Sequence, residues 1–313
     1  MARAPGFTSN PRIPFQMSTE RPPLAPPGGK PLIVHILVAL EHWRFDDHMP
    51  RHVMPAPHGL RPVPDVPNWS WAEYGMRCGM PRLLRVLGER GIKADACINA
   101  SVLDAYPSVA EAVRDAGWEF QGHGISQRAV AEGADERALI HAALDTLQKF
   151  CGYRPRGWTG PGLRETMETL DLLREAGVIY TCDWVVDDLP CWIRTKHGPM
   201  VAVPYTLELN DSVIYAVEKH SSDEQYRRLL ATLEAVEPEL ERGPRVVSLS
   251  LHHHLNGVLH RIRYVEKMLD ALLARNDVVF MTGGQIADWF IDQSGGPEMA
   301  PTPPDARGVP GAP

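Results

Sequence analysis

Short apolar segments of strand length alternate with longer amphipathic segments through the centre of this chain, and no other feature constrains the fold as strongly. The alternation recurs about six to eight times within roughly 260 residues, which favours a parallel β/α barrel or a doubly wound sheet. No G-x-G-x-x-G motif follows the first apolar segment, which argues against a dinucleotide-binding fold. The expected strands are 31–40, 93–98, 118–120, 157–159, 179–182, 200–203, 246–251 and 278–281. The expected helices are 80–90, 108–116, 135–151, 164–176, 223–239, 260–275 and 284–289.

Proline-rich segments flank this central region on both sides. Residues 1–29 hold seven prolines, and residues 295–313 hold six prolines and four glycines. Segments of this composition bury too little apolar surface to offset the entropy lost on ordering, so we expect both to be disordered. The predicted organisation is therefore one domain, residues 30–294, between two disordered tails. Met17 is a candidate start of translation beside Met1.

The composition narrows the classes of partner and the compartment. Hydrophobic residues make up 44% of the chain, and the formal net charge is −7, so no basic field favours nucleic acid or an anionic membrane. The five cysteines are odd in number and form no C-x-x-C pair, which favours reduced thiols over disulfides or a cysteine metal site. No apolar run typical of an export signal precedes Pro22, and the run 31–40 is too short to span a bilayer. We expect a cytoplasmic protein.

Polar and titratable residues follow five of the expected strands. In a β/α barrel the active site lies where the strands end and the loops begin, so these residues are expected to meet at one rim. A structural protein would have little reason to gather them there. The five strand ends read Glu41-His42, Gly122-His123-Gly124, Gly160-Pro161-Gly162, Asp183-Trp184 and His252-His253-His254.

Four of these side chains are candidates for chemistry. Glu41 follows an apolar strand, where partial desolvation raises a carboxyl pKa toward the range of a general base; an ion pair or a helix cap is the alternative. His123 lies between two glycines, poised to bind a ligand or metal, or else is a buried histidine bonded to backbone. Strand alternation puts His252 and His254 on one face and His253 on the other, so the first two are candidates for general acid, oxyanion stabiliser or metal ligand.

Further side chains are candidates for support. A carboxylate beside an imidazole fixes its tautomer, which makes Asp183 or the pair Asp187-Asp188 a candidate orienter of His252; surface acidity is the alternative for the pair. Arg154 precedes the 160–162 turn and is expected to hold the base carboxylate through a charge-assisted pair. Trp71 belongs to an aromatic segment, 68–74, that either covers the pocket or packs on the barrel rim.

Taken in order, the strand-end segments resemble the five motifs of the polysaccharide deacetylase family, known as the NodB-homology family, over roughly residues 31–290. The resemblance is closest to the branch of metal-independent allantoinases and cyclic imide hydrolases. The family motifs are matched by Glu41-His42, His123-Gly124-Ile125-Ser126-Gln127, Arg154-Pro155-Arg156-Gly157-Trp158, Asp183-Trp184 and Leu251-His252-His253-His254. The branch is matched by Tyr74-Gly75-Met76-Arg77, Asp187-Asp188-Leu189-Pro190, Pro204-Tyr205-Thr206, Asn210-Asp211 and the run from Leu251 to Gly257.

The resemblance implies a single-domain α/β fold, a distorted (β/α)7-type barrel, that hydrolyses an amide, imide or ureide bond. Glu41 matches the catalytic acidic residue and is expected to deprotonate water, directly or through His123. His252 then protonates the leaving nitrogen or stabilises the oxyanion, while Asp183 and Arg154 hold these groups in place. The residues expected to bind the substrate are Trp71, Trp158, Asp187, Tyr205, Asn210 and His254.

The resemblance also raises the question of a metal. In typical deacetylases an Asp after the catalytic acid joins two histidines of an H-x-x-x-H segment to bind a divalent cation. In this chain His42 stands at the position of that Asp, and Gln127 replaces the second histidine. An amide oxygen binds zinc more weakly than imidazole does, so we favour no catalytic metal. If zinc is present, its expected ligands are Glu41, His42, His123 and Gln127.

The leading prediction is a hydrolase of a non-peptide C–N bond in a small molecule, either an amide, a cyclic imide or a ureide such as allantoin. One alternative is a metal-dependent N-deacetylase of an acetylated sugar or polysaccharide. An alternative of another class is a non-catalytic barrel that binds a small ligand. The expected partner is a small amide-type substrate, without nucleic acid or membrane, and the resemblance implies a homo-oligomer.

Overall fold

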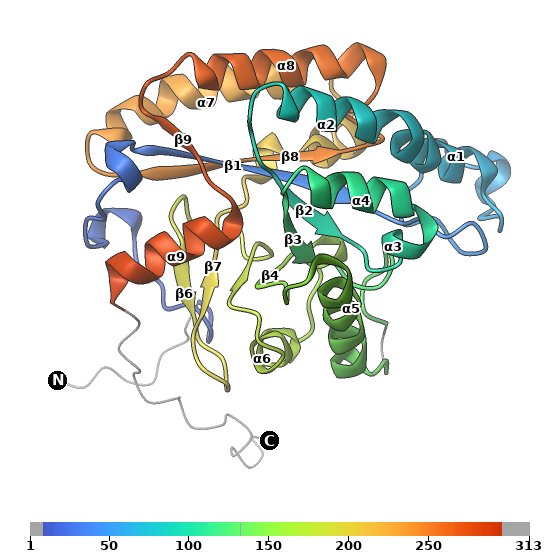
Figure 1. The fold of residues 1–313 in the computed structure, drawn as a ribbon, viewed down its shortest axis with the longest axis horizontal. Helices are drawn as coiled ribbons and strands as arrows, with labels where there is room; N and C mark the ends of the chain where they lie inside the picture. The colour runs from blue at the N-terminus through green and yellow to red at the C-terminus, as the bar shows by residue number, and fades with distance from the viewer. Residues whose placement is uncertain (1–8, 132, 296–313) are drawn as a thin grey trace, which may run out of the picture.

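A curled, mostly parallel sheet forms the centre of the protein, as the computed structural model of residues 9–131 and 133–295 shows (Figure 1). The strands lie in the order β6-β7-β5-β4-β3-β2-β1-β8, and β9 pairs with β1 outside this path. Only β6 and β7 pair in antiparallel orientation within the described sheet. The strands are β1 (Leu32–Leu40), β2 (Asp95–Ile98), β3 (Glu119–Gly122), β4 (Gly157–Trp158), β5 (Tyr180–Thr181), β6 (Cys191–Ile193), β7 (Met200–Ala202), β8 (Arg245–His252) and β9 (Val278–Phe280).

Strand β1 is the most enclosed strand of the sheet. Along one edge it pairs with β8, and along the other it pairs first with β9 and then with β2. A parallel strand covered on both faces reads as a nearly continuous apolar run, and Leu32–Leu40 has that character. Its one titratable residue, His35, is fully buried and lies 2.7 Å from the Asp95 carboxylate. The chain therefore leaves β1 at Glu41 with little freedom of direction.

The barrel is incomplete, and loop contacts close it between β8 and the segments just before β6 and just after β7. The hydroxyl of Ser248 donates to the carbonyl of Pro204 at 2.7 Å, and the amide of Val246 donates to the carbonyl of Asp188 at 2.9 Å. Asn210 and Ser250 form an isolated parallel bridge. The predicted distorted barrel is confirmed, with a half-barrel sheet whose open side is closed by residues 188–210.

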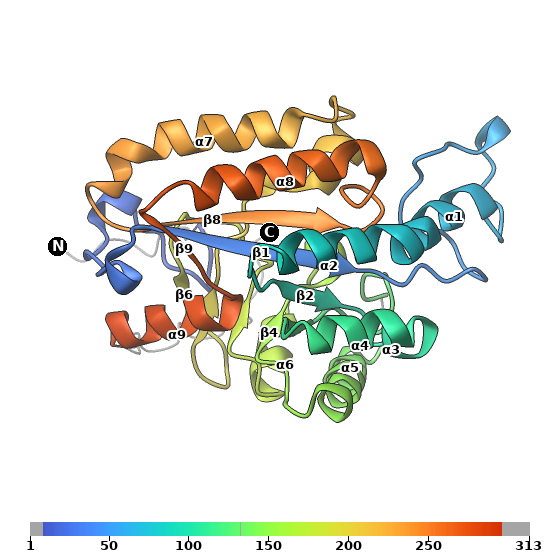
Figure 2. The same ribbon diagram turned by 45° about the horizontal axis from the view of Figure 1, so that its top comes forward.

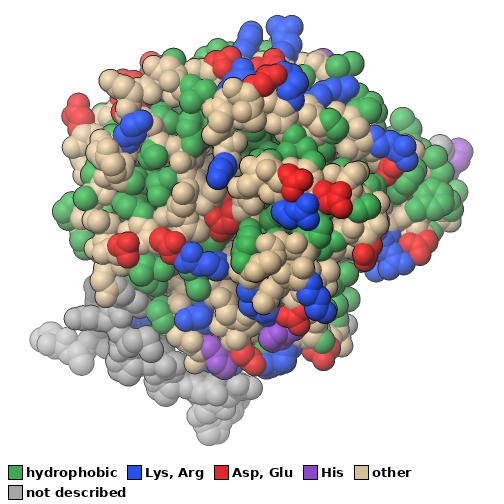
Figure 3. All heavy atoms as spheres, in the orientation of Figure 1, with side chains coloured by type: hydrophobic (Ala, Val, Ile, Leu, Met, Phe, Trp, Pro, Cys, Tyr) green, Lys and Arg blue, Asp and Glu red, His purple; other side chains and the backbone are tan. Residues whose placement is uncertain are grey.

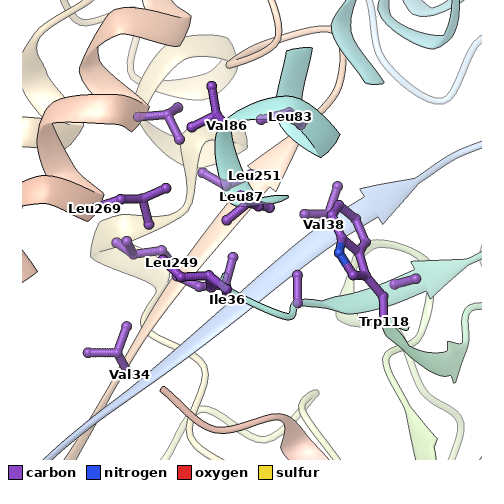
Figure 4. Packing of buried hydrophobic residues seen from close by; sticks show 14 of the residues in the cluster. Val34, Ile36, Val38, Leu83, Val86, Leu87, Trp118, Leu249, Leu251 and Leu269 are labelled. Atoms are coloured by element: carbon purple, nitrogen blue, oxygen red, sulfur yellow. The ribbon is translucent and has the colours of Figure 1, made fainter. Parts of the chain in front are cut away.

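Three helices cover β1 and β8, and they lie side by side in both ribbon views (Figure 2). These are α2, α7 and α8, whose apolar faces meet Ile36, Leu249 and Leu251 of the sheet in one buried cluster (Figure 4). Complete burial of each such aliphatic side chain stabilises the fold by about 1.5–3 kcal/mol. The helices are α1 (Val66–Tyr74), α2 (Met80–Gly88), α3 (Val102–Ala105), α4 (Pro107–Asp115), α5 (Glu136–Cys151), α6 (Thr169–Glu175), α7 (Glu224–Leu240), α8 (Leu259–Leu273) and α9 (Gly283–Ser294).

Helix α9 fills the N-terminal end of the barrel. Its first amides, those of Gly283 and Gly284, donate to the carboxylates of Asp95 at 2.8 Å and Glu119 at 3.1 Å. Carboxylates at a helix N-terminus satisfy free N–H groups and complement the helix dipole. Tyr180 lies beneath, with its hydroxyl 2.7 Å from Glu119. This end of the barrel is therefore occupied by side chains and helix, and the hollow part of the barrel lies at the other end.

The structure contains elements that the apolar pattern does not predict. Helix α1 was not expected, because its apolar residues do not recur at helical spacing, although Asp65 caps it by accepting the amide of Asn68 at 3.3 Å. The short strand β6 was also not expected. All eight expected strands are present, with bounds shifted by at most two residues. No helix within the described residues is long and apolar enough to cross a bilayer, and on the face in Figure 3 charges of both signs are interspersed.

The predicted disorder of residues 1–29 is wrong for residues 9–29, which follow a defined path along the barrel. Arg12 forms two hydrogen bonds with the carboxylate of Asp171, at 2.6 and 2.8 Å, and Arg21 pairs with Asp187 at 3.0 Å. Leu24 packs on the cluster beside α9. Prolines restrict the unfolded chain, so ordering this segment costs less entropy than its composition suggests. Residues 1–8 and 296–313 lie outside the described residues.

Three glycines allow the end of α1 and the start of α2 to pack against the chain just after β8. A Cβ atom at Gly79 or at Gly257 would overlap the carbonyl oxygen of His253, and one at Gly75 would overlap its ring. Gly75 and Gly79 bound a single π-helical turn, Gly75–Gly79, between the two helices. This close packing fixes the backbone of the three consecutive histidines at the end of β8.

We expect Gly79→Ala to lower the free energy of unfolding by about 1–3 kcal/mol, because the added methyl group must displace backbone at a packed contact. Gly88→Ala is the matched control at the far end of α2, since no atom lies within 4 Å of a Cβ there. That substitution should be neutral or stabilise by up to about 1 kcal/mol through helix propensity. Urea unfolding of the two variants compares them directly. Equal midpoints would contradict the role given to Gly79.

Candidate active site

Glu41, His123 and His252 meet where β1, β3 and β8 end. They surround an inner pocket of about 160 Å³ between the strand ends, which all three side chains line. An outer cavity of about 500 Å³ opens above it among the loops. Glu41, Gln127 and His252 line both hollows, so the two are continuous. The expectation that strand-end residues converge at one rim is confirmed for these three.

His252 is held between two carboxylates. Its Nδ1 lies 2.6 Å from Oδ1 of Asp211, and its Nε2 lies 3.3 Å from Oε1 of Glu41. The backbone amide of His252 also donates to Oδ2 of Asp211, at 2.7 Å. Burial alone would lower the pKa of His252, but the two carboxylates outweigh it and raise the pKa to about 10. The ring is therefore an imidazolium at neutral pH, with both N–H groups directed at anions.

Glu41 is buried, and both of its carboxylate oxygens accept hydrogen bonds. Its Oε2 accepts a hydrogen bond from the indole of Trp43 at 2.7 Å, and its Oε1 accepts one from the amide of Gln127 at 2.8 Å. Burial raises the pKa of Glu41, yet the hydrogen bond and positive charge of His252 lower it by more, so the pKa ends below its ordinary value. The predicted rise toward a general base was wrong, because the neighbouring imidazolium outweighs the desolvation.

His123 has the opposite character. Its Nδ1 is hydrogen-bonded to the carbonyl oxygen of Thr159, which can only accept, so Nδ1 carries the proton and Nε2 carries the lone pair. Burial lowers the pKa of His123 below its ordinary value, so the ring is neutral at pH 7. Its Nε2 is buried and has no hydrogen-bond partner among the described residues. A neutral imidazole with a free lone pair thus lines the inner pocket.

His254 lines the outer cavity together with His252, whereas His253 lies on the other face, as strand alternation predicts. The His254 ring packs edge-on against Trp71 and Trp43, with centroid distances of 4.6 and 5.1 Å. Burial lowers the pKa of His254 well below its ordinary value. A neutral, aromatic-supported histidine therefore forms part of the cavity wall.

Two residues predicted to hold the catalytic groups lie elsewhere. Asp183 accepts the amide of Gly160 with both oxygens, at 2.8 and 3.0 Å. The place beside His252 that was predicted for Asp183 is taken by Asp211. Arg154 donates to Asp145 at 2.6 Å and to the carbonyl of Ala176, away from Glu41. Both predictions were wrong, because Asp183 turns toward the loop after β4 and Arg154 precedes that strand and faces the neighbouring helices.

The residues predicted to bind substrate divide into two groups. Tyr205 and Asn210 line the inner pocket, where the amide of Asn210 donates to the Tyr205 hydroxyl at 2.9 Å, and His254 lines the outer cavity. The other three line neither hollow, so their placement at the site was wrong. Trp71 supports His254 from behind, Trp158 packs in the core over Gly122, and Asp187 pairs with Arg21 on a different part of the surface.

Sequence reasoning missed the roles of Asp211, Trp43 and Arg51. Asp211 follows Asn210, whose bridge to Ser250 carries it beside the end of β8. The only signal was the dipeptide Asn210-Asp211 among the branch motifs, which gave no partner. Trp43 and Arg51 lie in the long connection between β1 and α1, and Arg51 lines both hollows. No sequence pattern indicates which side chains of a long connection turn inward.

The four candidate metal ligands do not assemble into a cation site. His42 turns away, with Nδ1 2.8 Å from the Ser101 hydroxyl and its ring edge-on to Tyr106. Gln127 directs its amide nitrogen at Glu41, so the buried atoms of these four side chains that have no partner among the described residues are Nε2 of His123 and Oε1 of Gln127, one fewer than the three protein ligands of a typical catalytic zinc site. No group of three or more His, Cys, Asp or Glu side chains within residues 9–131 and 133–295 could hold a metal ion. The donor set therefore does not fit the divalent cation of typical deacetylases.

Comparison with known proteins finds a partial family match and two similar proteins. Residues 71–181 match the family model described as Polysaccharide deacetylase. The chain is 28% identical over 256 residues to a "Putative polysaccharide deacetylase" of Schizosaccharomyces pombe, an alignment that covers 75% of this chain and 79% of that protein. A "Peptidoglycan deacetylase-like protein" of Gibberella zeae is 23% identical over 143 residues, which cover 44% of this chain and 42% of that protein.

Solved structures share the fold. The crystal structure of Puue allantoinase superposes with a TM-score of 0.78 at 24% identity, covering 87% of this chain and 94% of that one. That of a "probable Polysaccharide deacetylase" from Pseudomonas aeruginosa PAO1 gives 0.77 at 24% identity, covering 88% and 95%. At such identities the likeness concerns the barrel alone. Residues 71–181 thus match the polysaccharide deacetylase family, and along three quarters of its length the chain is similar to a yeast protein described as such a deacetylase.

Proposed function

We propose that this chain hydrolyses a C–N bond of a small cyclic imide, ureide or related amide without a metal. The polysaccharide deacetylase family, whose model matches residues 71–181, consists of hydrolases acting on C–N bonds other than peptide bonds. The observation that carries the proposal is that one pocket is lined by two histidines of opposite protonation state. A protonated His252 lies between two carboxylates, and a neutral His123 presents a free lone pair.

In the proposed reaction His123 is the general base. A water molecule bound at its Nε2 loses a proton to that nitrogen as its oxygen bonds to the carbonyl carbon. The Nε2–H of His252, only loosely held by Glu41 at 3.3 Å, stabilises the developing oxyanion and then protonates the leaving nitrogen as the C–N bond breaks. The proton gained by His123 then passes to His252 through water, which restores the neutral base and the imidazolium. The net change is that the OH of water is on the carbonyl carbon and a proton is on the released nitrogen.

Glu41 and Asp211 hold the acid ready in this scheme. Glu41 is anionic and hydrogen-bonded through both oxygens, so it is a weak base that keeps His252 protonated. Asp211 orients the ring through Nδ1 and the backbone amide. Deprotonation of water by His123 is thus favoured over direct deprotonation by Glu41, which the sequence analysis had also kept open.

The size of the site supports a small substrate. The inner pocket of about 160 Å³ is below the range of about 300–1,000 Å³ that is usual for drug-sized ligands, and suits a compact ring or a short acyl group. Tyr205 and Asn210 offer polar contacts there. The allantoinase with this fold acts on a ureide, as its name states, which agrees with this substrate class.

A second candidate, N-deacetylation of an acetylated sugar, is favoured by the names of the yeast and Gibberella zeae relatives. The outer cavity, about 500 Å³ and walled by Trp43, is large enough for a sugar. The metal that such deacetylases use finds no matching donors here, so we place this candidate second. A non-catalytic binding barrel is the third alternative. The cytoplasmic location and the homo-oligomeric state stay predictions.

We expect His252→Ala and His123→Ala each to lower kcat by about 10²–10⁴ on a hydrolysed imide or ureide, because each removes a proton-transfer group. His220→Ala is the matched control, since that histidine is exposed and pairs only with Glu218 at 3.5 Å. Steady-state kinetics on a panel of ureides, imides and acetamides supplies the measurement. Near-normal turnover by either active-site variant, with native circular dichroism, would refute the proposed roles.

The expected pH dependence of kcat/KM follows from the protonation states of His123 and His252. Activity needs His123 neutral, which its lowered pKa permits from below pH 6.5 upward, and His252 protonated, which is lost as the pH rises through about 10. We expect kcat/KM to be level from about pH 7 to 9 and to fall near pH 10. In Asp211→Asn the alkaline limb should move down by at least about one pH unit, since a charge that raises the His252 pKa is gone. An unmoved limb on the same substrate would argue against His252 as the acid.

We expect dialysis against EDTA to change turnover by less than about twofold, because His42 turns away from the site and Glu41 is engaged by Trp43 and Gln127, which leaves too few free donors for a tightly bound cation. Metal content measured by mass spectrometry on the same sample accompanies the assay. Stoichiometric zinc, with activity lost on chelation and regained on addition of zinc, would instead support the deacetylase candidate.

A further inference from the structure

The site carries more positive than negative charge along its wall. Arg51 lines both the inner pocket and the outer cavity, and Arg128 and Arg164 line the outer cavity. Glu41 is the one carboxylate among the lining residues of the two hollows, and together with Asp211 it sets two negative charges against the single positive charge of His252. The three arginines add three positive charges to this wall, so a substrate enters past more positive than negative side chains.

The three arginines differ in how they are compensated. Arg128 is exposed and pairs with Asp47 at 2.6 Å. Arg164 is exposed on the turn after β4, where water screens its charge. Arg51 is half-buried, and no carboxylate within residues 9–131 and 133–295 forms an ion pair with it. Its recorded side-chain hydrogen bond runs from Nη1 to the carbonyl of Ser212, at a long 3.3 Å.

A half-buried guanidinium without an anion is unfavourable unless another group supplies the charge, since desolvation is not offset. The bond from Nη1 to Ser212 orients the fork of Arg51 from the chain segment that also carries Asp211. Its remaining N–H groups are directed donors that match the two oxygens of a carboxylate. Arg51 thus has the geometry and the unmet charge of an anion-binding side chain beside Glu41 and His252.

We propose that Arg51 binds a carboxylate on the substrate, so that the substrate class is carboxylate-bearing imides, ureides or amides. This inference rests on the proposed hydrolysis and adds a specificity-determining residue to it. A carboxylate is favoured over a phosphate because one half-buried arginine supplies the site, whereas a phosphate dianion calls for several donors. The small inner pocket would hold the ring while the substituent reaches Arg51 at the junction with the outer cavity.

The test compares hydantoin with hydantoin-5-acetate, two cyclic ureides that differ by one carboxymethyl group. The wild-type chain should prefer the carboxylate by about tenfold or more in kcat/KM. In Arg51→Gln the value for hydantoin-5-acetate should fall about 10–100-fold, the usual range for a charged hydrogen bond, while the value for hydantoin changes by less than about threefold. Arg51→Lys should recover part of the loss, since it keeps the charge without the fork.

Arg44→Gln is the matched control. Arg44 lies in the same connection, is exposed, pairs with Asp46 at 2.7 Å and lines neither hollow. It should leave both substrates unchanged. If the wild-type chain hydrolyses both ureides and Arg51→Gln affects them equally, the inference is overturned while the proposed function stands.

Calorimetric binding of hydantoin-5-acetate to His123→Ala separates the inference from catalysis. Binding that is lost when Arg51→Gln is added supports the inference, even where the wild-type chain turns over neither compound and the proposed function fails. Inorganic phosphate is the comparison anion, and phosphate that binds Arg51 more tightly than the carboxylate overturns the choice of carboxylate. Absence of any Arg51-dependent binding or turnover overturns the inference.

Discussion

A buried imidazolium between two buried carboxylates is the interaction on which the site depends. Each charge alone would be costly to desolvate, and the three groups are tolerable only together and in close register. The parallel pairing of β1 with β8 sets their positions. Ala39 lies opposite His252 in this pairing, and Glu41, two residues further along the chain, lies 3.3 Å from the ring. Strand β1, the most enclosed strand of the sheet, thus fixes the position of Glu41.

The open side of the barrel has a chemical consequence. A fully closed barrel would have a strand beside β8, and its side chains would alternate inward and outward. Here an irregular segment runs along β8 instead, held by Ser248 and the bridge of Asn210 to Ser250. Because this segment is not a regular strand, Asp211 can turn both carboxylate oxygens onto His252, one to the ring and one to the backbone amide. The incompleteness of the sheet is part of how the acid is held.

The sequence predicted the fold and the centre of the site because both follow from local rules. Strand length, apolar pattern and the strand-end position of catalytic groups located Glu41, His123 and His252. The same strand-end rule also selected Asp183, since it says which residues reach the rim but not which way they turn. Asp211 could not be predicted, because its place depends on contacts across the open side of the barrel. The depressed pKa of Glu41 likewise depends on a partner about 200 residues away in sequence.

Helix α9 closes the opposite end of the barrel with Asp95 and Glu119 bound to its first amides. A ligand therefore enters and leaves the inner pocket on one side, through the outer cavity. In the proposed reaction, opening of a ring creates a new carboxylate, which would leave past Arg51 along the path by which the next substrate arrives. If Arg51 binds the entering anion as proposed, it would also slow the departing one, so substrate selectivity and product release would depend on the same side chain.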